Sequence, residues 1–276
     1  MSSLAIIRDL APGLATFSTP FYRFAPLGYR KFVAVGLRSA AVKLHDNRVL
    51  VLNPIQLEKS VHDKLTAMGG VHFVASDLGH HLYVKDYLDT WPDAKAIGVK
   101  GLEGKRKDVK WNFVYENAQR KPEDVFGFSE DVESVMFEGF ITRAVAWYHR
   151  PSGTLIQSDL LMNLPCTEQY KPSSSDTGPL SRGFATLAYP QSLFHRALLY
   201  YAATTDYSLM RRDAKKVAEW NVQRIVPCHG ENIEGKKASE AWKSAYSWFL
   251  DGPASPSLFR RIGDTMNTIA RRLFLL

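Results

Sequence analysis

The stretch VHFVASDLGHH, residues 71–81, joins a short apolar segment to a loop that carries ligand-type side chains. Before this stretch, residues 56–68 place apolar side chains at helical spacing and end at two glycines, which predicts a helix. After it, residues 82–91 predict a second helix that ends before Pro92, and residues 95–99 predict another strand. Strands that alternate with helices in this way indicate a layered α/β fold.

Further strands are predicted on both sides of this region, because short apolar runs are separated by turn residues. The predicted strands lie within residues 31–52, 132–137, 141–148, 154–157 and 224–226. Helical spacing recurs later in the chain, at residues 192–220, 237–250 and 257–273. The polar and basic stretch 100–121 is expected to be a loop.

The composition is that of a globular protein: of 276 residues, 45% are hydrophobic and 23% are charged, which excludes a disordered or fibrous chain. We expect one elaborated domain over residues 1–252, followed by an amphipathic basic helix over residues 253–276. The two cysteines, Cys166 and Cys228, form no C-x-x-C motif, which favours a reducing, cytoplasmic location. The N-terminus lacks the pattern of a signal peptide, and no apolar window is long enough to predict a membrane span.

Ligand-type side chains follow three predicted strands directly. They lie in the loop of residues 76–81, in Ser158-Asp159-Leu160 and in Cys228-His229-Gly230-Glu231. Because strand ends meet at one edge of an α/β sheet, we expect these loops to converge there. Imidazole and carboxylate groups are ligands that Zn²⁺ and non-haem iron accept. Taken alone, Asp159 is also typical of a helix cap, and His229 of a turn in which it bonds to the backbone.

The order and spacing of several motifs resemble the metallo-β-lactamase superfamily, and specifically its branch named domain of unknown function 4336 in a fungal-like form. The matching segments are FSTPF at 17–21, GLRSA at 36–40, His80-His81, HRPSGTLIQSDLL at 149–161 and VPCHG at 226–230. The resemblance implies a four-layer αββα sandwich, here with extra C-terminal helices. It also implies a metal-dependent hydrolase of a small ester, thioester, lactone or amide.

The chain departs from the superfamily in a concerted way. The H-x-H-x-D-H loop of the superfamily corresponds to residues 76–81, whose sequence SDLGHH lacks the first two histidines. A third histidine, expected before the strand at 141–148, is missing from Glu138-Gly139-Phe140. In the superfamily these three ligands build the first metal site, so the resemblance implies that this site is lost. The positions of the second site match His80, His81, Asp159 and His229.

The resemblance therefore leads to the hypothesis of a single Zn or Fe ion at those four residues, unless a shift of the degenerate loop makes Asp77 a ligand. A bound metal ion lowers the pKa of a coordinated water and polarises a carbonyl group. Asp77 or Glu231 is then a candidate general base, and His149 is a further candidate. Cys228 is expected to be a small buried residue rather than a nucleophile. The alternative is a catalytically silent scaffold that binds a small ligand or a peripheral membrane.

The formal net charge of +7 is concentrated in two segments. Residues 252–276 carry four arginines against one aspartate, and residues 100–121 carry seven basic against three acidic residues. An apolar stripe flanked by basic residues is typical of a helix that lies on an anionic membrane or packs on its own domain; the arginines are Arg260, Arg261, Arg271 and Arg272. The sequence shows no nucleic-acid-binding motif and no phosphate-binding glycine loop. We expect a small-molecule substrate, no nucleic acid, and at most weak membrane contact through these arginines.

Overall fold

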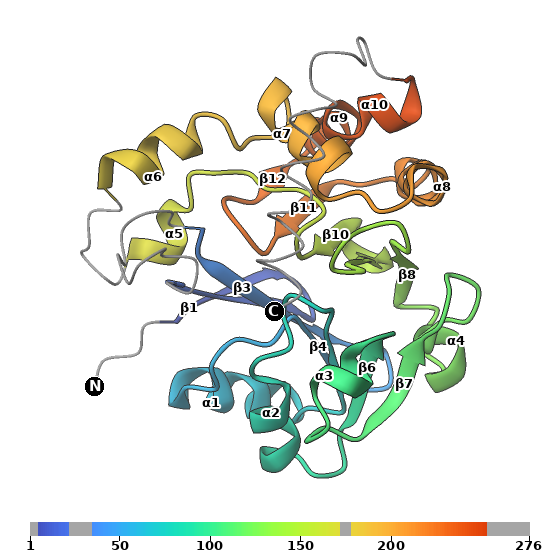
Figure 1. The fold of residues 1–276 in the computed structure, drawn as a ribbon. Coiled ribbons are helices and arrows are strands. Elements are labelled where there is room, and N and C mark those ends of the chain that lie inside the picture. Colours follow the sequence, from blue (N-terminus) through green and yellow to red (C-terminus); the bar gives the residue numbers. More distant parts are fainter. Residues whose placement is uncertain (1–4, 22–34, 172–177, 253–276) are drawn as a thin grey trace.

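The computed structural model describes residues 5–21, 35–171 and 178–252. Two β-sheets form its centre, and helices lie outside each of them (Figure 1). The predicted C-terminal helix at 253–276, with its four arginines, lies outside the described residues. The proposed division of the chain at residue 252 therefore stays a prediction.

The seven-stranded sheet follows the chain order from β1 to β7. Its strands are β1 (Ile6–Ala11), β2 (Leu14–Thr19), β3 (Leu37–Lys43), β4 (Val49–Leu52), β5 (Phe73–Ala75), β6 (Lys95–Val99) and β7 (Trp111–Tyr115). Neighbours from β1 to β4 pair antiparallel, whereas neighbours from β4 to β7 pair parallel and need crossover connections. The carboxyl ends of β4, β5 and β6 therefore lie at the same edge, where ligands collect in such sheets.

The five-stranded sheet has the order β12-β11-β10-β9-β8. Its strands are β8 (Val132–Met136), β9 (Val145–His149), β10 (Thr154–Gln157), β11 (Arg224–Pro227) and β12 (Ile233–Glu234). β10 and β11 are parallel neighbours, with Gln157 opposite Pro227, and the other pairs are antiparallel. This register brings the residues that follow β10 and β11 side by side.

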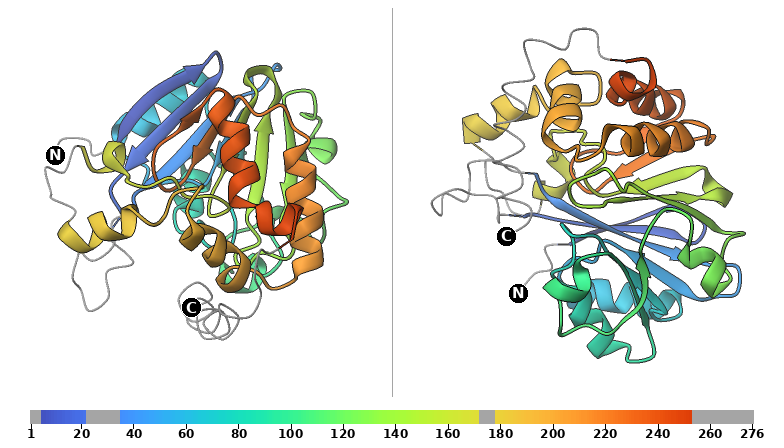
Figure 2. Two further views of the ribbon diagram at one scale, coloured as in Figure 1. Left: turned by 90° about the horizontal axis from the view of Figure 1, so that it is seen from above. Right: turned by 45° about the vertical axis from the view of Figure 1, so that its right-hand side comes forward.

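Helices flank both sheets, so the molecule has four layers (Figure 2). α1 (Lys59–Met68) and α2 (Val84–Thr90) cover the seven-stranded sheet, whereas α8 (Tyr207–Ala218), α9 (Lys236–Ala245) and α10 (Ser247–Leu250) cover the five-stranded sheet. The shorter helices are α3 (Leu102–Lys105), α4 (Pro122–Phe126), α5 (Thr167–Tyr170), α6 (Gly178–Ala185), α7 (Leu193–Ala197), the 3₁₀ turn η2 (Arg150–Ser152) and the π-helical turn η4 (Leu198–Ala202). Among the described residues, no helix is both long and apolar enough to cross a membrane.

Buried apolar side chains fill all three spaces between the layers. Ile97 of one sheet and Trp147 of the other belong to the core between the sheets. Leu65 of α1 is buried against the outer face of the larger sheet, and Trp242 of α9 against that of the smaller one. Burying a side chain of this size stabilises the fold by about 1.5–3 kcal/mol relative to leaving it exposed. These three cores confirm the predicted αββα sandwich.

The prediction of a loop over residues 100–121 is wrong, because α3 and the edge strand β7 lie within it. In β7, Phe113 and Tyr115 are buried while Asn112 between the strand's apolar side chains is exposed, so the period is two. The charges that flank this short strand hide that period in the sequence. β1 and β2 have no counterpart among the predicted strands, since Arg8 and Asp9 interrupt the apolar pattern of the exposed edge strand β1.

Candidate metal centre

Loops from both sheets converge at one place. The loop after β5 carries Asp77 and His80, whereas Asp159 follows β10 and His229 follows β11. The hydroxyl of Ser158 donates a hydrogen bond to Asp77 and so ties the loop of one sheet to that of the other. The convergence brings three of the sequence candidates, His80, Asp159 and His229, into one cluster.

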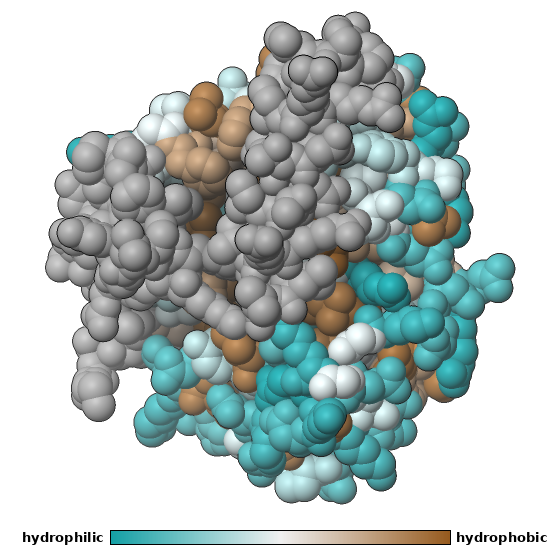
Figure 3. Space-filling view, viewed as in Figure 1, coloured by the Kyte–Doolittle hydropathy of each residue, from teal (hydrophilic) through white to brown (hydrophobic). Residues whose placement is uncertain are grey.

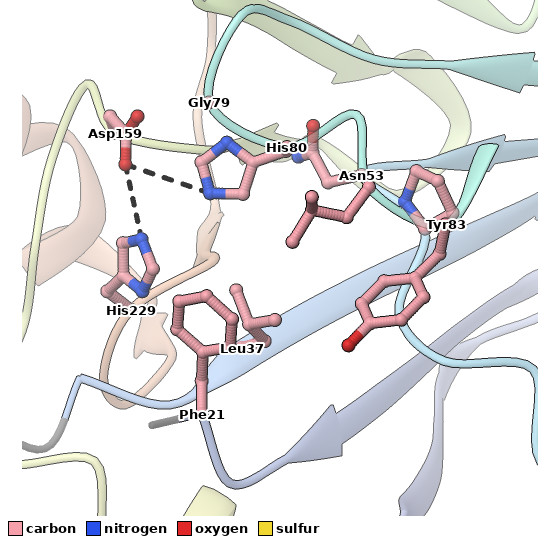
Figure 4. A pocket seen from close by; sticks show the side chains of 10 residues that line it. Phe21, Leu37, Asn53, Gly79, His80, Tyr83, Asp159 and His229 are labelled. Atoms are coloured by element: carbon pink, nitrogen blue, oxygen red, sulfur yellow. Dashed lines mark hydrogen bonds and ion pairs between the residues drawn. The ribbon is translucent and has the colours of Figure 1, made fainter. Parts of the chain in front are cut away.

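His80 and His229 direct their Nε2 atoms at the same oxygen of Asp159 (Figure 4). The distance to Asp159 Oδ1 is 3.1 Å from His229 Nε2 and 3.8 Å from His80 Nε2. The other oxygen of Asp159 accepts a hydrogen bond from the Thr142 hydroxyl at 3.3 Å. Two ligand atoms on a tetrahedral zinc ion are roughly 3.3 Å apart, because each lies about 2.0–2.1 Å from the metal. The observed separations therefore suit a shared ion.

The second nitrogen of each imidazole has an acceptor of its own. His80 Nδ1 lies 3.0 Å from Asp77 Oδ1, and His229 Nδ1 lies 2.8 Å from the carbonyl oxygen of Gly36. In the neutral rings each Nδ1 carries the proton and donates it, which leaves a lone pair on Nε2. Metal-binding histidines are held in this way, by a carboxylate or a backbone carbonyl on the nitrogen away from the metal.

The electrostatics of the cluster favour a cation between its members. Burial acts to lower the pKa of His80, but the charge of Asp159 and its other acidic neighbours raises it well above 6.5. The pKa of His229 is likewise raised, against the effect of burial, by Cys228 and Asp159. In return the two histidines lower the pKa of Asp159, although burial acts to raise it. A proton on the imidazoles or a metal ion satisfies this excess of negative charge.

Cys228 contributes a thiol to the same cluster. Ligand atoms of His80, Cys228 and His229 all lie within 4.8 Å of one another, and so do those of Asp77, His80 and Asp159. Burial acts to raise the pKa of the Cys228 thiol, but the nearby imidazoles His80 and His229 lower it. The residue is buried, as predicted, and its sulfur could also bind a metal ion. The sequence analysis missed this second role because it considered the thiol only as a small buried residue or as a nucleophile.

Asp77 is buried, and both of its carboxylate oxygens accept hydrogen bonds from neighbouring backbone and hydroxyl groups. Its Oδ1 accepts the backbone N–H groups of Gly79 at 2.8 Å and His80 at 3.0 Å, and its Oδ2 accepts the hydroxyl of Ser158. The same Oδ1 faces His80 Nδ1. This geometry is that of a group that orients His80.

Three other sequence candidates lie apart from the cluster. His81 is buried and belongs to neither group of ligand atoms; its carbonyl accepts a hydrogen bond from Arg106. Glu231 accepts hydrogen bonds from the Thr167 hydroxyl and, at 3.0 Å, from the first-turn N–H of Glu168 in α5. His149 lies at the far end of β9, where its Nδ1 is 2.7 Å from the Ser152 hydroxyl in the turn that leads to β10.

The cluster lies at the side of a pocket of about 490 Å³. In Figure 4, His80, Asp159 and His229 stand opposite apolar side chains; the apolar lining residues are Phe21, Leu37, Pro54, Leu82 and Tyr83. Gly79 completes the polar side, and a Cβ on it would lie 3.0 Å from Asp159 Oδ2, so a larger residue would have to displace this carboxylate by a few tenths of an ångström. The pocket therefore presents two imidazoles and a carboxylate to a small, partly apolar ligand.

Asn53 also lines this pocket, at the end of β4. Its φ of 52° is in the left-handed region, and the residue is 6% exposed. Its side-chain amide makes no hydrogen bond to any residue within 5–21, 35–171 or 178–252. Asparagine adopts the left-handed region more readily than other residues with a side chain, so the φ angle alone carries no functional conclusion. The amide of Asn53 is a candidate for contact with a substrate because it lines the pocket beside the ligand cluster. The sequence offered one signal for it, an Asn-Pro pair directly after an apolar strand.

Comparison with solved structures identifies the fold. The metallo-β-lactamase from Hirschia baltica superposes with a TM-score of 0.56 at 8% identity, over 90% of this chain and 98% of that one. The VMB-1 and DIM-1 structures superpose similarly, and TMB-1 gives a TM-score of 0.58 at 9% identity, over 89% of this chain and 98% of that one. This chain has the metallo-β-lactamase fold. The Flv1 flavodiiron core from Synechocystis sp. PCC6803 has it as well, with a TM-score of 0.59 at 13% identity over 89% of this chain and 60% of that one.

At these identities the likeness concerns the fold and not the activity. No family model matches the chain, and no curated protein matches it either. The ends of β5, β10 and β11 lie at one edge of the fold, and the donor set there could hold an ion. The chemistry must be argued from the cluster itself.

Proposed function

We propose that this protein is a metal-dependent hydrolase that holds one Zn or Fe ion through His80 Nε2, His229 Nε2 and Asp159 Oδ1. The observation that carries the proposal is the pair of Nδ1 hydrogen bonds, which turn both Nε2 lone pairs toward one carboxylate oxygen. Three protein ligands leave room for water and substrate, as in catalytic zinc sites and two-histidine, one-carboxylate iron sites. His81, the fourth ligand expected from the sequence, lies outside both ligand groups and is not included in this set.

The residues around the ion have separate tasks in this proposal. A bound Zn or Fe ion supplies a water of lowered pKa and polarises a carbonyl group. Asp77 holds His80 in the tautomer that leaves Nε2 free, so it is a positioning residue rather than the base. Asn53 donates its amide N–H to the carbonyl oxygen of the substrate and stabilises the negative charge that develops there. Glu231, the other candidate base, is held at the start of α5 and does not line the pocket.

The substrate proposed is a small ester, thioester or lactone. Apolar side chains wall the pocket on the side opposite the cluster, so it suits a molecule with one apolar part and one carbonyl. An alternative use of the same pocket is the binding of a small ligand without catalysis. That alternative draws support from Leu78, which stands where the superfamily has a histidine and packs against the core between the sheets.

Metal analysis of the purified protein tests the proposal. We expect close to one Zn or Fe per chain after purification without chelators, retained in the control variant His62→Ala on exposed α1 and lost in His80→Ala combined with His229→Ala. Protein that is free of metal, or a double variant that keeps its metal, would overturn the metal site. Metal-loaded protein that hydrolyses none of a panel of p-nitrophenyl esters, thioesters and lactones would favour the silent scaffold.

The Co²⁺-substituted protein then tells whether Cys228 is a further ligand. A thiolate on Co²⁺ gives an intense charge-transfer band in the near ultraviolet, whereas histidine and carboxylate ligands do not. We expect the open three-ligand set and therefore no such band. A band that disappears in Cys228→Ser would add the thiol to the ligand set and close the site.

The finer assignments rest on the sequence. We infer that the chain belongs to the branch named domain of unknown function 4336, from the order of its matching motifs, and that it acts in the cytoplasm, from two buried free cysteines.

A peripheral membrane contact through the C-terminal arginines, Arg260, Arg261, Arg271 and Arg272, is proposed from the charge pattern. Co-sedimentation with anionic liposomes, with and without residues 255–276, tests it; equal binding by both forms would remove the idea.

A further inference from the structure

A second cavity lies on the other side of Asp159. The empty space between its walls is about 410 Å³, part of which is open to solvent, and the cavity shares Asp159 with the pocket of the metal centre. Its walls come from the loop between β8 and β9, from the segment after β10, and from α7 with η4; the lining residues besides Asp159 are Phe140, Ile141, Met162, His195, Leu198, Leu199, Ala202 and Ala203. Apart from Asp159 and His195, every lining residue is apolar.

His195 is the polar exception, and it is completely buried at 0% exposure. Its Nε2 accepts the backbone N–H of Met162 at 3.0 Å. Burial lowers the pKa of His195 to about 4, so the ring is neutral near pH 7. With Nε2 as the acceptor, the single ring proton is on Nδ1. Nδ1 has no hydrogen-bond partner in the part of the chain that the structure describes.

An unsatisfied buried donor costs folding free energy, and the great majority of buried polar groups avoid it. Here the donor belongs to a ring that lines an otherwise apolar cavity. The wall beside it includes η4 (Leu198–Ala202), a π-helical turn, and such turns are frequent at functional sites. A ligand that fills the cavity with methylene groups and offers one oxygen to Nδ1 would satisfy both the apolar wall and the donor.

The surface near α7 is also apolar. Leu187, Tyr189, Leu193 and Tyr207 are large hydrophobic residues with at least 39% exposure, and all lie close in sequence to His195. Figure 3 shows hydrophobic surface over the region of α6 and α7. A contiguous apolar surface is typical of a binding site, whereas single exposed apolar residues are ordinary.

We propose that this cavity binds the apolar chain of the substrate, and that His195 Nδ1–H donates a hydrogen bond to an oxygen on that chain. The inference rests on the proposed function for its catalytic part, because Asp159 lines both the cavity and the pocket where the carbonyl group reacts. It narrows the substrate to an acyl compound whose apolar chain carries a keto or hydroxyl oxygen. Binding of the chain itself needs no metal.

Methyl hexyl ketone is the test ligand, since it has one oxygen acceptor and an apolar chain and is not hydrolysed. We expect saturable binding to the metal-free protein by ligand-observed NMR. Ala202→Phe or the milder Ala203→Leu should weaken binding at least tenfold by filling the cavity, whereas Ala197→Phe, on α7 but outside the lining, should not change it. In long-range proton–nitrogen spectra, the Nδ1 signal of His195 should shift on binding.

The outcomes separate this inference from the proposed function. Absence of ketone binding, or binding that neither cavity-filling variant weakens, overturns the chain site whether or not the protein holds metal. Binding with an unmoved His195 Nδ1 signal overturns the hydrogen bond. If the metal-loaded protein is a hydrolase, it should cleave p-nitrophenyl octanoate at least tenfold more efficiently than the acetate, and Ala203→Leu should remove that preference. Equal efficiency for both esters overturns the chain site as a substrate subsite but leaves the hydrolase intact.

Discussion

Asp77 and Asp159 are buried carboxylates of neighbouring loops, and they are satisfied by different partners. Backbone N–H groups of Gly79 and His80 and the hydroxyl of Ser158 hold Asp77, so neutral donors of the fold stabilise its charge. Asp159 instead has one neutral donor at 3.3 Å, Thr142, and otherwise faces imidazole nitrogens. The first arrangement orients a neighbour, whereas the second requires a cation. The contrast is the reason that Asp159, and not Asp77, is the proposed ligand of the ion.

The loops that carry Asp77 and Asp159 also differ in how they are attached to the sheets. The loop after β5 is tied into the scaffold, with Ser76 N–H bonded to the Ile97 carbonyl at 3.0 Å and Leu78 packed on the core between the sheets. The residues after β10 and β11 come from two parallel strands in fixed register and present Asp159 and His229 to the pocket. Of the three proposed ligands, Asp159 and His229 therefore come from the five-stranded sheet, and only His80 comes from the seven-stranded sheet.

Of the substitutions considered, Asp159→Asn should have the largest effect on metal binding and activity. Loss of the carboxylate removes one of three proposed ligands, so we expect loss of stoichiometric metal and a fall in ester hydrolysis of about a thousandfold or more. Asp77→Asn should weaken metal affinity by only about 10–100-fold, as is typical for a group that orients a ligand. Equilibrium dialysis against Zn²⁺ with metal analysis measures both. Equal losses in the two variants would contradict the division of roles.

The buried histidines also differ in their surroundings, and the pH dependence of the unfolding free energy should show the difference. Burial lowers the pKa of His195 to about 4, against about 6.5 in the unfolded chain. Between these values the unfolded chain binds a proton that the folded chain does not, so the free energy of unfolding falls as the pH falls, by roughly 3 kcal/mol in total. His80 and His229 act in the opposite sense in the metal-free protein, because their pKa values are raised and their contribution is lost as the pH rises.

Urea unfolding of the metal-free protein at a series of pH values isolates the contribution of His195. The difference in unfolding free energy between the native chain and His195→Gln should change through pH 6.5 to 4 and be flat above pH 7. A difference that does not vary with pH would mean that His195 is not held neutral by burial.

The sequence predicted that the residues at the centre of the candidate site converge, because that convergence depends on topology. His80, Asp159 and His229 each follow an apolar strand, and strand ends meet at one edge. The adjacent pair His80-His81 could not be resolved in this way, since only the backbone of the turn decides which ring faces the pocket. The roles of Asp77 and His195 depend on which atoms lie within hydrogen-bond distance, and a one-dimensional pattern does not contain those distances.

Asn53→Gly separates backbone strain from chemistry at the pocket. Glycine adopts the φ of 52° without cost, so stability should be unchanged or slightly higher, while loss of the amide should lower kcat by about tenfold to a hundredfold with metal content unchanged. Asn47→Gly is the matched control, because Asn47 has a φ of 68° in a turn outside the pocket. Its kcat should equal that of the native protein. If both variants keep full activity, Asn53 does not contact the reacting carbonyl.

Glu231→Gln should have the smallest effect on activity. It tests whether Glu231, the second candidate base beside Asp77, takes part in the reaction. Glu231 accepts the Glu168 N–H at 3.0 Å at the start of α5 and lies outside the pocket lining. Glutamine keeps an oxygen that can accept this N–H, so the substitution removes only the negative charge that favours the helix N-terminus. We expect a destabilisation of about 0.5–1 kcal/mol, with metal content and the pH profile of kcat unchanged. Thermal unfolding and the pH–rate profile measure these. Loss of the acidic limb of that profile would instead make Glu231 the base and return it to the catalytic machinery, despite its position at α5.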